Sequence, residues 1–261
     1  MTTEAEALSR PPIFLIGAPR SGTTLLRLML DSHPNISAGP ETNFLTYFEP
    51  IVGEHWPRLQ LYGLSQTDWY ARIGGFFDAF QMEYAQRRGK RRWAEKTPAY
   101  TLHLEFINAL FPDSQMIHII RDGRDVVNSH LNRWGYRRAW RSVRKWPEYV
   151  ALGREFGRKY PARYHELRYE ALIDQPELTI RPILTFLQEP WDDAVLNFPG
   201  QPHDKQARYD QFTQSQRAKG GETDLIYRSR SGSWRRELPL SLRLACRLRQ
   251  ATLLRELGYA V

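Results

Sequence analysis

The sequence predicts a three-layer α/β/α fold of the P-loop type, built around a central parallel sheet. Residues 13–16 (IFLI) form an apolar run that ends at a glycine and leads through a turn-prone segment into a helical pattern. Residues 115–120 (QMIHII) have the composition of a buried parallel strand, and a loop and a helix are expected after them. Because strands that alternate with helices usually pair in parallel, we expect both units in one sheet.

The remaining chain is expected to complete a single domain over residues 1–261. Residues 1–10 are expected to form a flexible tail, and residues 199–232, which begin with a segment poor in apolar side chains, a mobile loop. The other predicted elements are helices at 69–88 and 100–110, a strand in RRWAEKTP, a basic helical stretch from Trp134 to Tyr160, a strand ending near Arg168, and helices at 177–187 and 241–257.

Composition limits the partners and the compartment. Lys and Arg number 37 against 29 Asp and Glu, and the net charge of +8 favours anionic partners such as phosphates, nucleic acid or acidic peptides. The single cysteine, Cys246, excludes an intrachain disulfide, and the seven histidines lack close pairing, so no metal site is expected. The single cysteine fits a reducing compartment, so a cytoplasmic location is expected. The polar N-terminus and the lack of long apolar runs predict no secretory signal and no membrane anchor.

The segment GAPRSGTT, residues 17–24, has the GxxxxG spacing of a phosphate-binding loop between a strand and a helix. Backbone N–H groups and the positive end of the next helix would form a cradle for a phosphate, and the hydroxyls of Ser21, Thr23 and Thr24 would add donors around Gly22. Arg20 lies inside the loop, and Thr23 stands where a nucleotide triphosphatase has its lysine. This pattern favours one 5'-phosphate over a triphosphate; the alternative is a turn without a ligand.

A second anion site is predicted at the end of the strand at 115–120. Arg121 ends that strand, and Ser129 follows two helical turns later, so both side chains can converge on one small anion. The alternative is that Asp122 caps a helix while Arg121 pairs with a surface acid.

These two segments carry a resemblance to sulfotransferases that use 3'-phosphoadenosine-5'-phosphosulfate (PAPS). PPIFLIGAPRSGTTLLRLMLDSHPNISAGPET is similar to the 5'-phosphosulfate loop of that family, and FPDSQMIHIIRDGRDVVNS is similar to its 3'-phosphate strand, loop and helix. The resemblance runs from about Pro11 to Leu196 and is closer to the branch of tyrosylprotein sulfotransferases and bacterial enzymes, whose loop carries Arg. It implies PAPS as co-substrate, 3'-phosphoadenosine-5'-phosphate (PAP) as product, and no metal.

The resemblance also implies catalytic residues. Sulfuryl transfer needs a base for the acceptor proton and positive groups for the leaving phosphate. Glu41 in GPETN matches the carboxylate base of the tyrosylprotein branch, and Arg20 and Lys96 match residues that stabilise the leaving phosphate and the sulfonate. The small-molecule branch instead has a histidine two residues after the corresponding lysine, where Pro98 stands here.

Glu41 and Lys96 can each also be explained without a catalytic role. Glu41 would also suit the first turn of a helix at 42–48, and Lys96 could be a solvated lysine beside Glu95.

Further contacts to the nucleotide follow from the same resemblance. Tyr169 matches a tyrosine near the adenine, although a tyrosine at a strand end is often simply packed. RSRSGSWRREL resembles the family's late loop over the 3'-phosphate, with Arg228, Arg230 and Gly232 as candidate phosphate partners; a solvated basic loop is the alternative.

The predicted function is transfer of a sulfuryl group from PAPS to a hydroxyl or amine of a small-molecule, carbohydrate or peptide acceptor. One alternative is a P-loop small-molecule kinase, which would bind ATP with magnesium; the missing loop lysine weighs against it. The other is a non-catalytic basic module that binds nucleotides or nucleic acid, suggested by the net charge and the basic stretch from Trp134 to Trp146. No nucleic-acid partner is expected, because that stretch also fits a helix with a solvated basic face or a surface that attracts anionic acceptors.

Overall fold

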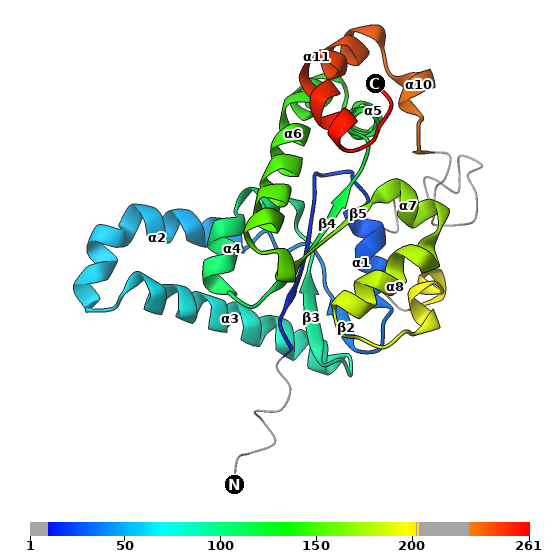
Figure 1. Cartoon of the computed structure of the whole chain (residues 1–261). Coiled ribbons are helices and arrows are strands. Elements are labelled where there is room, and N and C mark those ends of the chain that lie inside the picture. The colour runs from blue at the N-terminus through cyan, green and yellow to red at the C-terminus, as the bar shows by residue number, and fades with distance from the viewer. Residues whose placement is uncertain (1–9, 202, 204–229) are drawn as a thin grey trace.

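A parallel sheet forms the centre of the protein (Figure 1). The computed structural model describes residues 10–201, 203 and 230–261. The strands are β1 (Ile13–Ile16), β2 (Ile36–Ala38), β3 (Arg92–Glu95), β4 (Gln115–Ile120) and β5 (Tyr164–Arg168). Their order is β2-β3-β1-β4-β5, and every neighbouring pair is parallel, which confirms the predicted fold class.

The two faces of the sheet are covered by different helices. On β1, Ile13 and Leu15 pack with α1 (Thr23–Asp31), α7 (Tyr169–Asp174) and α8 (Pro176–Phe186). Phe14 and Ile16 point the other way, as alternation along a strand requires, and pack with helices on the opposite face. The helices that pack on that face are α2 (Leu45–Leu59), α3 (Gln66–Arg87), α4 (Leu104–Leu110) and α6 (Tyr136–Lys159). Above the sheet in the view of Figure 1 lie α5 (Gly123–Trp134), α10 (Trp234–Glu237) and α11 (Leu240–Glu256).

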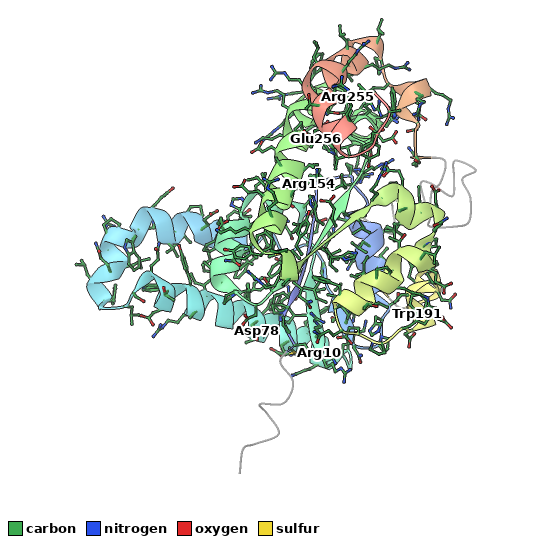
Figure 2. All side chains as sticks on the ribbon, in the orientation of Figure 1. Arg10, Asp78, Arg154, Trp191, Arg255 and Glu256 are labelled. Carbon is green, nitrogen blue, oxygen red and sulfur yellow. The ribbon has the colours of Figure 1, made fainter. Side chains whose placement is uncertain are left out.

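The protein also has an arm made of α2 and α3. Figures 1 and 2 show these helices reaching away from the sheet, whereas side chains fill the space between the sheet and the other helices. None of the described helices is long and apolar enough to span a membrane.

The strand order creates a switch point beside β1. From β1 the chain crosses to β2 and β3 on one side, and β4 and β5 then lie on the other side. In open parallel sheets the crevice at such a point, outside the carboxyl ends of the strands, is the usual ligand site. The loops after β1 and β4 therefore meet there, and these are the loops that carry Arg20 and Arg121.

Several boundaries differ from the sequence-based expectations. The short strand β2 was not expected, and the predicted helix at 42–48 begins only at Leu45, so Glu41 precedes it. The predicted helix at 100–110 is a 3₁₀ turn, η2 (Pro98–Leu102), followed by α4, because His103 adopts a non-helical backbone between them. Residues 1–9, and all but the ends of the loop expected at 199–232, lie outside the described residues.

Candidate active site

The phosphate loop joins β1 to α1 through two residues with positive φ. Arg20 has a φ of 75° and Gly22 a φ of 98°, and Ser21 N donates to Ala18 O at 3.1 Å to close the turn. A Cβ on Gly22 would lie 2.9 Å from Tyr169 Cε2 and closer still to Cδ2. Glycine is therefore required at position 22 both by conformation and by space. The loop also leaves Ser21 Oγ buried without a hydrogen-bond partner in the described part of the chain.

Arg20 joins the two predicted phosphate sites. Its Nε donates to Ser129 Oγ at 3.0 Å, and Arg121 Nη1 donates to Arg20 O at 3.2 Å. Its guanidinium also lies 5.8 Å from the centre of the Trp134 ring. Residues more than a hundred positions apart in sequence thus form one site at the switch point.

Positive charge is concentrated around Arg20. Burial, together with repulsion from Arg133, Arg121 and Arg230, lowers the pKa of Arg20 to about 10. Arg133 was not singled out from the sequence, although it follows Ser129 by four residues and hence shares its helix face. The repulsion is a cost that a bound anion would relieve.

The guanidinium of Arg121 is held over the Tyr169 ring at 4.4 Å from its centre. Its Nη2 donates to Arg230 O at 2.7 Å, while its Nε is buried without a partner in the residues described. Arg121 therefore does not pair with a surface acid, although Asp122 does cap α5, accepting from Arg124 N at 2.9 Å. Tyr169 is buried and packed, as its structural alternative expected, yet the packing is against Arg121 and the phosphate loop.

Arg230 and Gly232 lie at the site because Asp125 fixes the turn that carries them. The Asp125 carboxylate accepts from Gly232 N at 2.7 Å and from Trp234 N at 3.0 Å. The backbone of Arg230 and Gly232 is thus bonded to Arg121 and Asp125. Arg228 lies outside the described residues.

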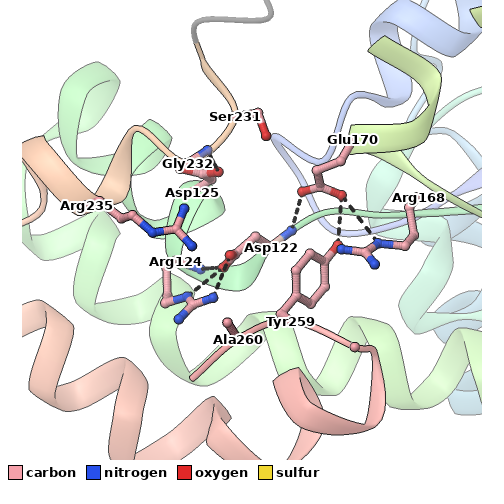
Figure 3. Close-up of a pocket in the computed structure, with 11 residues that line it drawn as sticks. Asp122, Arg124, Asp125, Arg168, Glu170, Ser231, Gly232, Arg235, Tyr259 and Ala260 are labelled. Atoms are coloured by element: carbon pink, nitrogen blue, oxygen red, sulfur yellow. Dashed lines mark hydrogen bonds and ion pairs between the residues drawn. The ribbon is translucent and has the colours of Figure 1, made fainter. Parts of the chain in front are cut away.

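A second network, of hydrogen bonds and an ion pair, holds the turn between β4 and α5 (Figure 3). Glu170 accepts from Asp122 N at 3.0 Å and from Tyr259 OH at 2.9 Å, and it lies 3.8 Å from Arg168. The C-terminal tail is therefore tied to the strand ends that carry Arg121 and Tyr169.

Glu41 and Lys96 form an ion pair next to the phosphate loop. The Lys96 side chain is 3% exposed and that of Glu41 is 40% exposed. Lys96 Nζ also lies 3.4 Å from Thr24 Oγ1, so the lysine stands between the carboxylate and the loop. Burial lowers the pKa of Lys96, and its pairing with Glu41 opposes that shift. A solvated surface lysine, the alternative left open by the sequence, is thus wrong.

Buried Glu95 connects the loops that carry these two residues, and sequence reasoning missed this role. It accepts from Thr97 Oγ1 at 2.6 Å, from Gln81 Nε2 at 2.8 Å and from Thr42 N at 3.4 Å. Burial raises the pKa of Glu95 to about 7, against these hydrogen bonds. Its position directly before Lys96 at a strand end was the available signal.

Comparison with known proteins shows a family for the chain. A family model described as the sulfotransferase family matches residues 11–193, which include the phosphate loop, Glu41, Lys96 and Arg121. The chain is similar to protein-tyrosine sulfotransferase A of Caenorhabditis elegans, with 32% identity over 205 residues that cover 72% of this chain and 52% of the relative. It thus spans about half the length of that curated relative.

Solved structures share the fold. The sulfotransferase domain of the Synechococcus PCC 7002 olefin synthase superposes with a TM-score of 0.68 at 24% identity, covering 96% of this chain and 95% of that domain. Mouse sulfotransferase SULT7A1 complexed with PAP superposes with a TM-score of 0.52 at 14% identity, covering 95% and 85% of the two chains. At these sequence identities the similarity shows a shared fold alone.

Proposed function

Because the chain belongs to the sulfotransferase family, we propose that it transfers a sulfuryl group from PAPS to a hydroxyl group of an acceptor. The observation that carries the proposal is the convergence of Arg20, Arg121 and Ser129 at the switch point of the sheet. Two anion sites that share one hydrogen-bonded centre suit a nucleotide with a phosphate at each end.

The residues of the site fit that nucleotide. The phosphate loop offers backbone N–H groups at the start of α1, Ser21 offers a hydroxyl, and Gly22 leaves a cradle that a side chain would fill. Arg121 has a buried Nε that still lacks a partner among the described residues. Arg20 links it to Ser129, since Arg20 O accepts from Arg121 Nη1 and Arg20 Nε donates to Ser129 Oγ. We assign the loop to the 5'-phosphosulfate, and Arg121, Ser129 and Arg133 to the 3'-phosphate.

PAPS would supply the sulfuryl group and leave as PAP. The acceptor oxygen forms a bond to sulfur while the bond from sulfur to the bridging phosphate oxygen breaks, and the acceptor proton passes to Glu41. Arg20 and Lys96 stabilise the negative charge that the leaving oxygen gains, because buried Lys96 and partly buried Arg20 are cations at the phosphate loop. Arg20 remains protonated, so it acts as a charge and a hydrogen-bond donor.

A kinase on the same fold is the competing function. It would need a lysine after the second glycine of the loop, and Thr23 is there instead. Lys96 reaches only the end of the loop, at Thr24, and from a different strand.

The test compares ligands and then transfer. We expect PAP to raise the melting temperature of the protein more than ATP with magnesium does, and [³⁵S]PAPS to label a phenol or alcohol acceptor. Arg20→Ala should abolish both responses, whereas Arg137→Gln, an exposed change on α6, should leave both intact. Greater stabilisation by ATP that a chelator removes would overturn the proposal in favour of a kinase.

A further inference from the structure

A cavity of about 250 Å³ lies against the phosphate loop, on the side of α5 and α6. Ala18 and Pro19 line it from the loop, Leu102 from the end of η2, and Val126 and His130 from α5. These side chains lie outside the set that we assign to the nucleotide. Ligand pockets for drug-sized molecules run from roughly 300 to 1,000 Å³, so this cavity suits a small molecule or one side chain.

The cavity shares its walls with the nucleotide site. Pro19 directly precedes Arg20, and His130 directly follows Ser129, which accepts from Arg20 Nε. Leu102 ends the η2 turn that begins two residues after Lys96. The cavity therefore adjoins the nucleotide site at Pro19 and His130.

Part of the cavity is apolar and firmly held. Trp146 is 1% exposed, and its indole Nε1 donates to Arg121 O at 3.1 Å, which fixes the ring. Together with Leu102 and Val126 it offers a surface on which a ring or alkyl group can pack.

The α6 side of the cavity is cationic. Arg138, Arg141 and Lys145 line it at spacings of three and four residues, which place them on one face of the helix. Lys145 is neutralised by Glu148, with Nζ 2.7 Å from Oε2. Arg138 and Arg141 are exposed and form no ion pair with any residue that the structure describes. An anion at this wall would meet two uncompensated guanidinium groups.

His130 adds a polar group inside the cavity. Its Nε2 faces Pro19 O at 3.4 Å and, because a carbonyl only accepts, Nε2 carries the proton in the tautomer that makes this contact. Nδ1 is then an acceptor, and it is buried with no partner in the described part of the chain. Burial lowers the pKa of His130 to about 4, and Arg20 and Arg138 also act to lower it, so the ring is neutral at pH 7. A hydrogen-bond donor on a ligand would satisfy Nδ1.

We propose that this cavity binds the acceptor, and that the acceptor is a small phenol or alcohol carrying a carboxylate. The inference rests on the proposed function and specifies its acceptor. The ring or chain packs on Trp146, the carboxylate faces Arg138 and Arg141, and the hydroxyl points past Pro19 toward Arg20 and the sulfuryl group.

The test uses two probes that differ in charge, 4-hydroxyphenylacetate and the neutral 4-ethylphenol, and the variant R138Q/R141Q. With [³⁵S]PAPS, the KM for 4-hydroxyphenylacetate should rise about tenfold or more in the variant, as expected when two charges that pair with a ligand are removed. The KM values for 4-ethylphenol and for PAPS should change less than about twofold, within the range of neutral surface changes. The control is Arg144→Gln, an exposed arginine of α6 that does not line the cavity, and it should leave all three values unchanged.

A binding measurement separates this inference from the proposed function. Isothermal titration of the PAP-bound wild-type protein should detect 4-hydroxyphenylacetate, and the variant should weaken that binding by a similar factor. Normal PAP binding with equal KM values for the acid in both proteins would overturn the cavity assignment and leave the sulfotransferase proposal standing. Preferred sulfation of an acidic tyrosine peptide, unaffected by R138Q/R141Q, would also overturn it. Failure of PAP to bind would instead contradict the proposed function.

Discussion

The close approach of Gly22 and Tyr169 gives a quantitative test of the site. In Gly22→Ala the new Cβ would meet the Tyr169 ring, 2.9 Å from Cε2 and nearer to Cδ2, and it would also lie 3.3 Å from Ile119 Cδ1. The ring cannot move freely, because it is buried and lies under the Arg121 guanidinium. The substitution should therefore disturb the phosphate loop and Arg121 together.

Two separable costs make up the expected loss of stability. An alanine in the left-handed region, which Gly22 occupies at a φ of 98°, costs about 1–2 kcal/mol. Forcing a methyl group against a buried ring costs about 1–3 kcal/mol more. Gly22→Ala should thus lower the free energy of unfolding by about 2–5 kcal/mol and weaken PAP binding at least about tenfold, because the cradle is displaced.

The assay is a double-mutant cycle with Tyr169→Ala, measured by denaturant unfolding and by PAP titration. Removing the ring relieves the collision but not the backbone strain, so Gly22→Ala should cost about 1–2 kcal/mol in the Tyr169→Ala background. Gly75→Ala is the control, since a Cβ there has nothing within 4 Å, and it should be neutral or slightly stabilising. Equal costs of Gly22→Ala in both backgrounds would refute the argument.

Three further predictions concern the catalytic loops and Arg20. Glu41→Gln should lower kcat by about 10²–10⁴-fold while leaving PAP affinity within about twofold, as expected for a general base, and steady-state kinetics with calorimetry will measure both. Ser129→Ala, by removing the oxygen that Arg20 Nε meets, should weaken PAP binding by about ten- to a hundredfold, measured by calorimetry. Glu95→Gln should flatten the fall in stability between pH 5 and 8, because the folded protein keeps a proton on Glu95 that the unfolded chain releases. In the wild type this contribution to the free energy of unfolding is complete below pH 4.5 and is lost as pH rises through about 7. The loss is about 3 kcal/mol and can be followed by denaturant unfolding.

Each of these predictions has its own control and contrary result. Glu256→Gln, a carboxylate on α11 (Figure 2), should leave kcat unchanged, and full activity of Glu41→Gln would remove Glu41 from the mechanism. Unchanged PAP affinity in Ser129→Ala would contradict a 3'-phosphate site at α5. An identical pH profile of stability for Glu95→Gln and the wild type would contradict a raised pKa of Glu95.

The strands and long helices were predictable because their patterns are local. Residues 13–16 and 115–120 are strands with the predicted bounds, since a buried parallel strand needs an unbroken apolar run. β2 has only three residues, too few for such a run, and it exists because Ile36–Ala38 pairs with Arg92–Ala94 of β3. The helix expected at 42–48 begins late because Thr42 and Leu45 N bond to Tyr100 OH, a contact that no local pattern encodes.

The site was predictable as a set of residues but not as a network. The loop spacing and the residue types pointed to Arg20, Arg121 and Ser129, and the structure brings these together. Their direct contacts depend on the strand order, which puts β4 next to β1. The sequence did not indicate the role of Glu95, because the burial of its side chain depends on the fold and not on a local pattern.

A crystal structure of the protein with PAP tests the central claim most directly. It should place the 5'-phosphate on the backbone of residues 20–24 and the 3'-phosphate between Arg121 and Ser129, with Arg20 contacting the nucleotide. A nucleotide bound elsewhere, or one whose phosphates do not span these two groups, would contradict the account.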